Sequence, residues 1–302
     1  MNRNPSMQRA YIGRFAPSPS GPLHFGSLVA ALGSYLDARH HGGHWLLRME
    51  DIDPPRERPG AARDILRTLE RFGFEWDGEV LYQSRRDGAY REQLERLLRH
   101  HHAFACRCSR REVAAAAHNG TEGPLYPGTC RRDPPQPRPG LAVRLCSDHP
   151  EAVAFHDRVC GPIAQWIARD IGDFVIRRAD GIFAYQLAVV IDDAGQGVNQ
   201  VVRGADLLLS TPRQILLQRL LGLPTPRYAH LPLVLGEDGR KLSKQSAARP
   251  VRPERPLEAL LAAYRFLGQR FPDAAQPATP EEFWPLVLEQ WEIARVPVSG
   301  IN

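Results

Sequence analysis

The sequence contains very little lysine and no long apolar segment. Lys+Arg number 39, yet only Lys241 and Lys244 are lysine. No stretch approaches the ~18 uninterrupted apolar residues of a membrane span, and the first residues lack the apolar run of a secretory signal. Five cysteines are too few, and odd in number, for a disulfide framework in a chain of this length. We therefore expect a cytoplasmic protein without a membrane partner, whose cysteines are reduced or hold a metal.

The overall composition is that of an ordinary globular protein. With 302 residues, 43% hydrophobic and 24% charged, the chain is long enough for two domains, or for one large domain with an insertion. The net charge of +5 permits a polyanionic partner without requiring one.

The two lysines lie close together, in residues 241–245. A codon bias toward arginine explains the scarcity of lysine elsewhere and makes these two exceptions informative. A compact ammonium group can approach a phosphate in a way that the bulky guanidinium fork cannot. We predict that Lys241 and Lys244 bind phosphate on a loop, with a solvated basic loop as the simpler alternative.

Hydrophobic periodicity predicts alternating strands and helices in the first 73 residues. This order is typical of a parallel α/β sheet. Residues 103–140 look like an insertion, because they contain three cysteines and a tail rich in Pro, Gly and Arg. Cys146 and Cys160 fall in expected strands and are interpreted as small buried hydrophobes. Strands are expected at 10–15, 45–50, 142–145, 174–177 and 198–203, helices at 28–36, 59–73, 215–221, 257–267 and 281–293, and a hairpin turn at 180–181 between 175–176 and 183–185.

A loop rich in turn-forming residues joins the first strand to the first helix. A helix start at this edge of an α/β sheet presents free N–H groups to a phosphate. Gly26 would allow a base or ribose to approach the backbone, and His24 could donate to a phosphate oxygen. A polar turn that caps the helix is an equally good reading of this segment alone.

Together, the His24-Phe25-Gly26 segment and the Lys241-Leu242-Ser243-Lys244 loop resemble the HIGH and KMSKS signatures of the class I aminoacyl-tRNA synthetases. Further segments, residues 14–21, 48–53 and 202–208, resemble the glutamyl branch of that family, and the likeness extends over residues 8–250. It implies an α/β fold with a Rossmann-like catalytic domain. It also implies ATP binding by His24, Gly26, Lys241 and Lys244, with His24 and Lys244 catalytic.

A glutamate substrate also makes sense from the residues. A dicarboxylate amino acid needs guanidinium partners for its carboxylates and an anion for its ammonium group. Arg14 and Arg203 are candidates for the first role, Glu50 for the second, and the Tyr185 hydroxyl could fix orientation. Each of these alone could be a surface ion pair or a core tyrosine. The family resemblance places around the amino acid Arg14, Phe15, Ala16, Pro17, Ser18, Glu50, Tyr185 and Arg203.

Three cysteines of the insertion have a spacing compatible with a metal site. Cys106 and Cys108 could chelate one ion together with Cys130, but a tetrahedron needs a fourth ligand. Tyrosine is an uncommon ligand, His118 is an alternative by chemistry, and inert cysteines are equally plausible from spacing alone. A subgroup of the family holds zinc with two cysteines, a tyrosine and a third cysteine. That resemblance implies one structural Zn²⁺ on Cys106, Cys108, Tyr126 and Cys130.

The residues after Gln245 are too few for the large helical anticodon-binding region of a full glutamyl-tRNA synthetase. Ser27 also departs from the second histidine of the HIGH signature. With the cysteine insertion, these features resemble the subgroup of glutamyl-queuosine tRNA(Asp) synthetases. The resemblance implies activation of L-glutamate by ATP, with Mg²⁺ and without tRNA, then transfer to the queuosine base in the anticodon of tRNA(Asp).

Three alternatives remain from the sequence. One is a truncated synthetase that charges a tRNA 3′ end, and another is a non-catalytic RNA-binding paralogue. The third, an adenylyltransferase of another small carboxylate, is disfavoured because Arg14, Glu50 and Arg203 occur together. We expect a monomer, divided into the first half of the catalytic domain (1–102), the zinc-binding insertion (103–140), the second half with the lysine loop (141–250) and a C-terminal helical region (251–302).

Overall fold

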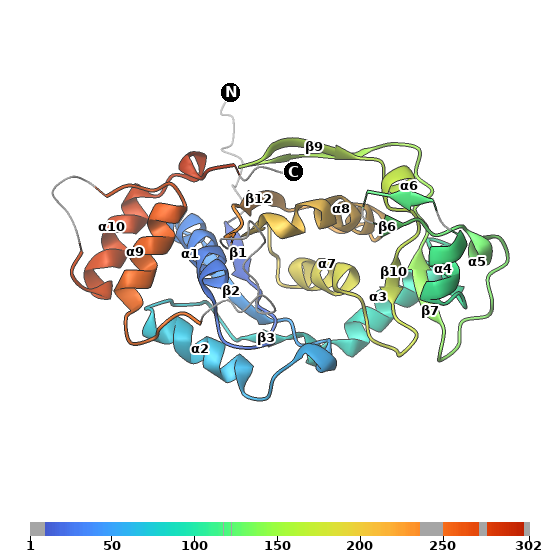
Figure 1. Ribbon diagram of the computed structural model, residues 1–302, viewed down its shortest axis with the longest axis horizontal. Coiled ribbons are helices and arrows are strands. Elements are labelled where there is room, and N and C mark those ends of the chain that lie inside the picture. Colours follow the sequence, from blue (N-terminus) through green and yellow to red (C-terminus); the bar gives the residue numbers. More distant parts are fainter. Residues whose placement is uncertain (1–9, 117, 122, 236–249, 272–276, 299–302) are drawn as a thin grey trace, which may run out of the picture.

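The computed structural model describes residues 10–116, 118–121, 123–235, 250–271 and 277–298. Sheets occupy the centre and helices cover them on either side, with the C-terminal helices at one end and the insertion at the other (Figure 1). Within the described residues, no helix is long and apolar enough to cross a membrane.

The N-terminal third forms parallel β/α units, as the periodicity predicts. Strands β1 and β2 pair in parallel, with Ile12 opposite His44 and Phe15 opposite Leu47, and β2 pairs in parallel with β3. The intervening helix α1 lies against both strands. Gly42, with φ of +62°, reverses the chain after this helix, a conformation that glycine adopts without strain. The bounds are β1 Ile12–Phe15, α1 Phe25–His40, β2 His44–Met49, α2 Ala61–Arg71 and β3 Leu81–Tyr82.

A second sheet, in the order β11-β12-β8-β9, continues the architecture beside β1. Strand β11 pairs in parallel with β12, and the backbone N–H of Asn199, just before β11, donates to the carbonyl of Ile12 over 3.0 Å. The N-terminal strand therefore lies between elements from both halves of the chain. The bounds are β8 Val153–Asp157, β9 Gly161–Gln165, α7 Tyr185–Gly195, β11 Gln200–Gly204, η3 Ala205–Ser210, α8 Thr211–Leu220 and β12 Arg227–Leu231.

The insertion is attached to a small antiparallel sheet in the order β10-β7-β4. Strands β4 and β7 run antiparallel and pair directly, so the chain leaves and re-enters at neighbouring positions. The bounds in this region are η2 Gln83–Arg85, α3 Asp87–Arg99, β4 Ala103–Cys106, α4 Arg110–Ala116, β5 Asn119–Gly120, β6 Gly123–Pro124, α5 Thr129–Arg132, β7 Ala142–Leu145, α6 Ile167–Asp170 and β10 Val175–Arg177.

The C-terminal helices α9 (Pro256–Phe266) and α10 (Pro280–Gln290) pack against α1. The buried indole of Trp291 donates to the carboxylate of Asp37 in α1 over 3.1 Å. The same carboxylate binds Tyr11 and, through two nitrogens, Arg158. Asp37 thus joins the first strand, the first helix, the β8–β9 hairpin and the C-terminal region.

Two expectations from the sequence are wrong. The turn at Asp180–Gly181 exists, but Tyr185 starts helix α7 rather than continuing a second strand. Cys146 directly follows β7 and Cys160 lies in the turn between β8 and β9, and both are only partly buried, not small buried hydrophobes within strands. The antiparallel β8–β9 hairpin itself lacks a strong turn signal, and its pairing is visible only in the folded chain.

Candidate active site

The predicted amino-acid-binding residues come together at the carboxyl ends of β1, β2 and β11. Arg14 lies in β1, Glu50 directly follows β2, and Arg203 lies in β11, while Tyr185 begins α7. Ligands bind open α/β sheets at this edge, where neighbouring strands are connected in opposite directions. The structure therefore brings side chains from positions 14 to 203 into one region.

Two residues that the sequence did not single out connect this group. The carboxylate of Asp193, in α7, accepts from Arg14 Nε over 3.2 Å and lies 2.8 Å from Arg48 Nη1. Arg48 also reaches the Glu50 carboxylate over 3.4 Å. Burial raises the pKa of Asp193, but Arg14 and Arg48 outweigh it and hold that pKa below its ordinary value. Asp193 is therefore a fixed anion that positions two guanidinium groups.

For Glu50, the effect of burial on the pKa exceeds that of the neighbouring positive charges, which is the opposite of the balance at Asp193. The pKa of Glu50 is raised, because burial outweighs the stabilising charges of Arg48 and Arg14. Only 10% of its side chain is exposed, so its negative charge is poorly solvated. A bound ammonium group would stabilise this carboxylate directly.

Arg203 is buried, and no ion pair joins it to another residue that the structure describes. Its guanidinium donates to the Tyr185 hydroxyl over 3.3 Å and to His230 Nε2 over 3.1 Å. Its other acceptors are the Thr211 hydroxyl, the Gln214 amide oxygen and a backbone carbonyl. Among the described residues, every hydrogen-bond partner of Arg203 is uncharged, since the pKa of His230 falls to about 4 mainly through burial. The site thus has a surplus positive charge suited to an anionic ligand.

The loop after β1 contributes backbone more than side chains. The ring of Phe15 is buried in the core, stacked on Trp45 with centroids 6.1 Å apart. The carbonyl of Pro17 accepts from the N–H of Glu50 over 3.0 Å. Ala16 is partly buried and Ser18 is exposed. This loop is therefore tied to Glu50, and Phe15 can meet a ligand only through its main chain.

His24 caps helix α1. Its Nδ1 accepts from the backbone N–H of Ser27 over 3.3 Å, so Nε2 carries the ring proton and can donate. The Ser27 hydroxyl lies 3.1 Å from that Nε2, at the position where the sequence departs from the family signature. A side chain at Gly26 would lie 3.2 Å from the His24 ring. The helix start therefore presents a donor and free N–H groups.

Lys241 and Lys244 lie outside the described residues. Pro250, shortly after them in the sequence, forms a β-bridge with His24. The next residue, Val251, donates its N–H to the carbonyl of Leu23 over 2.9 Å. The chain therefore returns from the lysine segment directly beside the start of α1.

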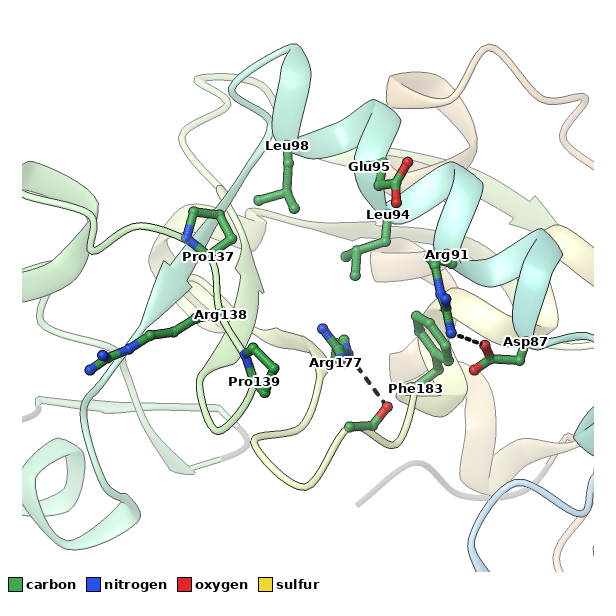
Figure 2. A pocket seen from close by; sticks show the side chains of 11 residues that line it. Asp87, Arg91, Leu94, Glu95, Leu98, Pro137, Arg138, Pro139, Arg177 and Phe183 are labelled. Carbon is green, nitrogen blue, oxygen red and sulfur yellow. Dashed lines mark hydrogen bonds and ion pairs between the residues drawn. The ribbon is translucent and has the colours of Figure 1, made fainter.

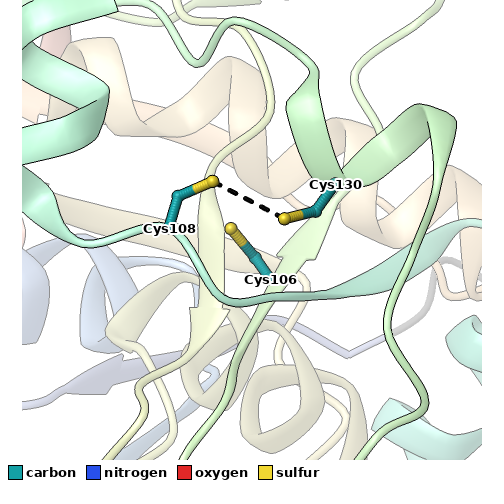
Figure 3. A group of neighbouring side chains, drawn as sticks. All are labelled: Cys106, Cys108 and Cys130. Atoms are coloured by element: carbon teal, nitrogen blue, oxygen red, sulfur yellow. Dashed lines mark hydrogen bonds between the residues drawn. The ribbon is translucent and has the colours of Figure 1, made fainter.

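The side chains of Cys106, Cys108 and Cys130 converge in the insertion (Figure 3). Their sulfur atoms lie within 4.8 Å of one another, and Sγ of Cys108 is 3.5 Å from Sγ of Cys130. The Tyr126 hydroxyl lies 3.5 Å and 3.6 Å from Sγ of Cys106 and Cys108. Zinc bound tetrahedrally to thiolates at ~2.3 Å requires such separations. These four residues, hereafter the cysteine cluster, therefore have the donor set for zinc.

His118 lies outside the cysteine cluster, whereas Arg144 contacts it. His118, the alternative ligand, is exposed and does not belong to the metal-compatible group. Arg144, in β7, donates from Nε to Sγ of Cys106 over 3.3 Å, and its guanidinium lies 4.2 Å from the centroid of the Tyr126 ring. A cation at this position favours anionic thiolate and phenolate ligands.

A cleft of about 410 Å³ lies outside this site. It is formed by α3, residues 137–139 and the turn around Gly181, and Arg138 points away from it (Figure 2). Its Asp87 and Arg91 are paired with each other. None of the predicted amino-acid or nucleotide residues that the structure describes lines this cleft.

The family model "tRNA synthetases class I (E and Q), catalytic domain" matches residues 12–257. The chain belongs to this family and is therefore an enzyme of the ligase class, with ATP, glutamate and tRNA as the partners that membership implies. The α/β fold predicted from the sequence is thus confirmed.

The chain is similar to named members of this family. It is 57% identical over 297 residues to the glutamyl-Q tRNA(Asp) synthetase of Dechloromonas aromatica, covering 98% of both chains. It is 56% identical to the protein of that name from Chromobacterium violaceum, covering 97% of each. Among solved structures, a glutamate tRNA ligase from Elizabethkingia meningosepticum, in complex with its amino acid, has a TM-score of 0.77 at 25% identity. That match covers 96% of this chain but 66% of the ligase.

Sequence reasoning missed Arg48, Asp193, Asp157 and His230. The first lies within a segment quoted for its family resemblance, and Asp193 interrupts an apolar helical run, which is a detectable signal. Nothing local distinguishes Asp157 or His230, because their significance arises from pairing between distant strands.

Proposed function

We propose that this enzyme activates L-glutamate with ATP in the absence of tRNA and transfers it to the queuosine base in the anticodon of tRNA(Asp). The observation that carries the glutamate assignment is the buried surplus of positive charge at Arg203, together with the poorly solvated carboxylate of Glu50, since both groups act on the Tyr185 hydroxyl. The acceptor assignment is supported by relatives of that name that match over nearly the whole chain.

Glutamate recognition follows from charge complementarity. Arg14, already oriented by Asp193, and Arg203, with the Tyr185 hydroxyl, supply donors for the two carboxylates. Glu50 receives the ammonium group, and the loop of Phe15, Ala16, Pro17 and Ser18 encloses the amino acid with its backbone. Guanidinium–carboxylate bonds are stronger than neutral ones, so neutral amino acids should bind far more weakly.

The first chemical step is attack of the glutamate α-carboxylate on the α-phosphorus of ATP, which releases pyrophosphate and gives glutamyl-adenylate. His24 donates from Nε2 to the transferring phosphoryl group, near Gly26 and the free N–H groups of α1. Lys241 and Lys244 neutralise the phosphates, with Lys244 acting on the developing charge. ATP enters as its Mg²⁺ complex.

In the second step, a hydroxyl of the queuosine cyclopentene ring attacks the activated carbonyl carbon, and AMP leaves. The enzyme contributes position and electrostatics rather than a covalent nucleophile. Cys106, Cys108, Tyr126 and Cys130 would hold zinc in a structural role, because four protein ligands would leave no position for a substrate. We further propose a cytoplasmic monomer with the four-part division predicted from the sequence.

Pyrophosphate exchange tests the first step. With ATP and no tRNA, glutamate alone among the amino acids should support exchange. Absence of exchange with glutamate would contradict the proposal.

A set of tRNA substrates tests the acceptor. Labelled glutamate should join queuosine-containing tRNA(Asp), including a form that lacks its 3′-terminal adenosine, and should not join the tRNA with guanine at the wobble position. Nuclease digestion should place the label in the anticodon fragment. The resemblance to a glutamate tRNA ligase supports charging of a 3′ end as the second candidate. That candidate predicts loss of label on removal of the terminal adenosine and indifference to queuosine.

A further inference from the structure

A buried hydrogen-bonded chain runs from Asp157 through His230 to Arg203. The Asp157 carboxylate lies 2.6 Å from Nδ1 of His230, and Nε2 of the same ring lies 3.1 Å from Nε of Arg203. The side chains of Asp157 and His230 are both completely buried. Arg203 and His230 are cross-strand partners in the parallel β11–β12 pair, so the sheet register itself brings their side chains together.

The donors and acceptors of this chain allow one tautomer of His230. An arginine N–H can only donate, so Nε2 of His230 must accept. Nδ1 therefore carries the proton and donates it to Asp157. The backbone N–H of His230 also donates to this carboxylate, as do those of Val159 and Cys160, which fixes the carboxylate in turn.

The imidazole separates the negative charge of Asp157 from Arg203. A carboxylate placed directly on Arg203 would occupy the donors that a substrate carboxylate needs. The His230 ring, the Thr211 hydroxyl and the Gln214 amide instead hold Nε and Nη2. The remaining terminal nitrogen, Nη1, donates to the hydroxyl oxygen of Tyr185. Because this oxygen accepts from Arg203, the hydroxyl proton of Tyr185 points away from Arg203.

We propose that Asp157 and His230 are positioning residues for glutamate: the fixed tautomer of His230 orients Arg203 by its Nε and leaves Nη1, with the Tyr185 hydroxyl, to bind a carboxylate of the amino acid. This inference rests on the proposed function, because it assigns the anion at Arg203 to the glutamate substrate. Neither residue touches the substrate, so their effect passes entirely through Arg203.

Asp157→Asn tests the tautomer. The remaining carbonyl oxygen can still accept from the backbone of the turn, while the new amide N–H faces Nδ1 of His230. The ring proton must then move to Nε2, where it opposes Nε–H of Arg203. In the Ser-His-Asp triad, the same change of the aspartate leaves the geometry intact but gives the histidine the wrong tautomer. We expect the KM for glutamate to rise about 30-fold in pyrophosphate exchange, with the KM for ATP changed less than about twofold.

Asp37→Asn is the matched control. Asp37 is equally buried and accepts from Tyr11, Arg158 and Trp291, but it is not part of the chain to Arg203. Both variants should lower the melting temperature, and only Asp157→Asn should raise the KM for glutamate. An equal rise in both would overturn the inference, since it would trace the effect to general loosening of the core.

A second pair of variants covers the case in which Asp157→Asn disturbs folding. His230→Leu removes the acceptor and should raise the KM for glutamate at least as much, whereas His230→Gln keeps an acceptor and should recover part of the affinity. Nitrogen-15 NMR of the His230 ring should report Nδ1–H in the unmodified protein and Nε2–H in Asp157→Asn, with no substrate needed.

The outcomes separate the two proposals. No exchange with glutamate in the unmodified enzyme overturns the proposed function and, with it, this inference. Exchange in the unmodified enzyme, with an unchanged KM for glutamate in Asp157→Asn or His230→Leu, overturns the inference alone.

Discussion

The amino-acid site and the cysteine cluster differ in the size of the hydrophobic core that surrounds them. The amino-acid site lies where the two largest hydrophobic cores meet, one of which includes Phe15 and Met49 and the other Val201 and Ile191. Among the residues that the structure describes, the core around the cysteine cluster has five buried members, namely Phe104, Cys106, Val113, Tyr126 and Cys130. Three of those five are themselves cluster residues.

This difference in core size implies that the side chains of the two sites are held in place in different ways. Arg14 and Arg203 are held by Asp193 and by the chain through His230, so they are oriented before a ligand arrives. A core of five residues cannot supply comparable stability, and a structural metal is the usual substitute in small units. The first site is thus organised by the fold, whereas the second should depend on zinc.

The largest effect should come from the amino-acid site. Arg203→Gln removes the buried guanidinium and should lower kcat/KM for glutamate activation by about 1,000-fold, or about 4 kcal/mol. The zinc content should not change, because the cysteine cluster lies elsewhere. Pyrophosphate exchange and metal analysis on one preparation measure both, and a loss of zinc would contradict the independence of the two regions.

The second largest effect should be a loss of folding stability in acid, caused by His230 in the same region. Burial, opposed only in part by the hydrogen bond to Asp157, lowers the pKa of His230 from 6.5 to about 4. The unfolded chain therefore takes up the proton first, so this contribution to stability is complete above about pH 6.5 and is lost as the pH falls toward 4. The loss amounts to about 3 kcal/mol from the difference in pKa.

Urea unfolding between pH 7.5 and pH 4.5 measures this effect. His230→Gln should have a flatter dependence than the unmodified protein, whereas Cys130→Ser should retain most of the slope. Parallel curves for His230→Gln and the unmodified protein would show that this histidine does not titrate as described.

The third effect concerns the lysine segment, which belongs to neither of the two sites compared above. Lys244→Arg keeps the charge but not the compact ammonium group, so adenylate formation should slow about 100-fold with the fold intact, as expected for loss of one transition-state contact. Single-turnover formation of glutamyl-adenylate measures the step, with circular dichroism as the check on folding. A rate close to that of the unmodified enzyme would refute the argument from lysine scarcity.

The smallest effect on catalysis should come from the cysteine cluster. Cys130→Ser should abolish stoichiometric zinc binding and lower stability by about 2 kcal/mol, while the KM for glutamate stays within about twofold. Metal analysis, limited proteolysis near residues 103–140 and thermal unfolding measure these outcomes. A large rise in that KM would mean that zinc also organises the amino-acid site.

The predictions from the sequence were most accurate for features that depend on a local sequence pattern. The β/α order of the first 73 residues follows from hydrophobic periodicity and glycine positions, and the segments around Arg14, Glu50 and Arg203 were recognisable as motifs. The hairpin expectation failed at Tyr185 because an apolar-aromatic run suits a strand and a buried helix start alike.

What the sequence could not reveal are the partners of those residues. Asp157 pairs with His230 only because β8 lies next to β12, and Arg48 meets Asp193 only because α7 packs over the sheet. Such pairings depend on strand order and register, which no local spacing encodes. For the same reason, the neutral surroundings of Arg203 emerge only in three dimensions.

The ion pair between Arg14 and Asp193 also has a consequence for biosynthesis. The two residues are separated by 179 positions, and a ribosome adding ~5–20 residues per second needs roughly 10–40 s to make the intervening chain. Throughout that interval, the first strand exposes a cation whose partner does not yet exist. Glutamate binding should therefore arise late, after most of the chain has left the ribosome, and the nascent N-terminal third should have no affinity for the amino acid.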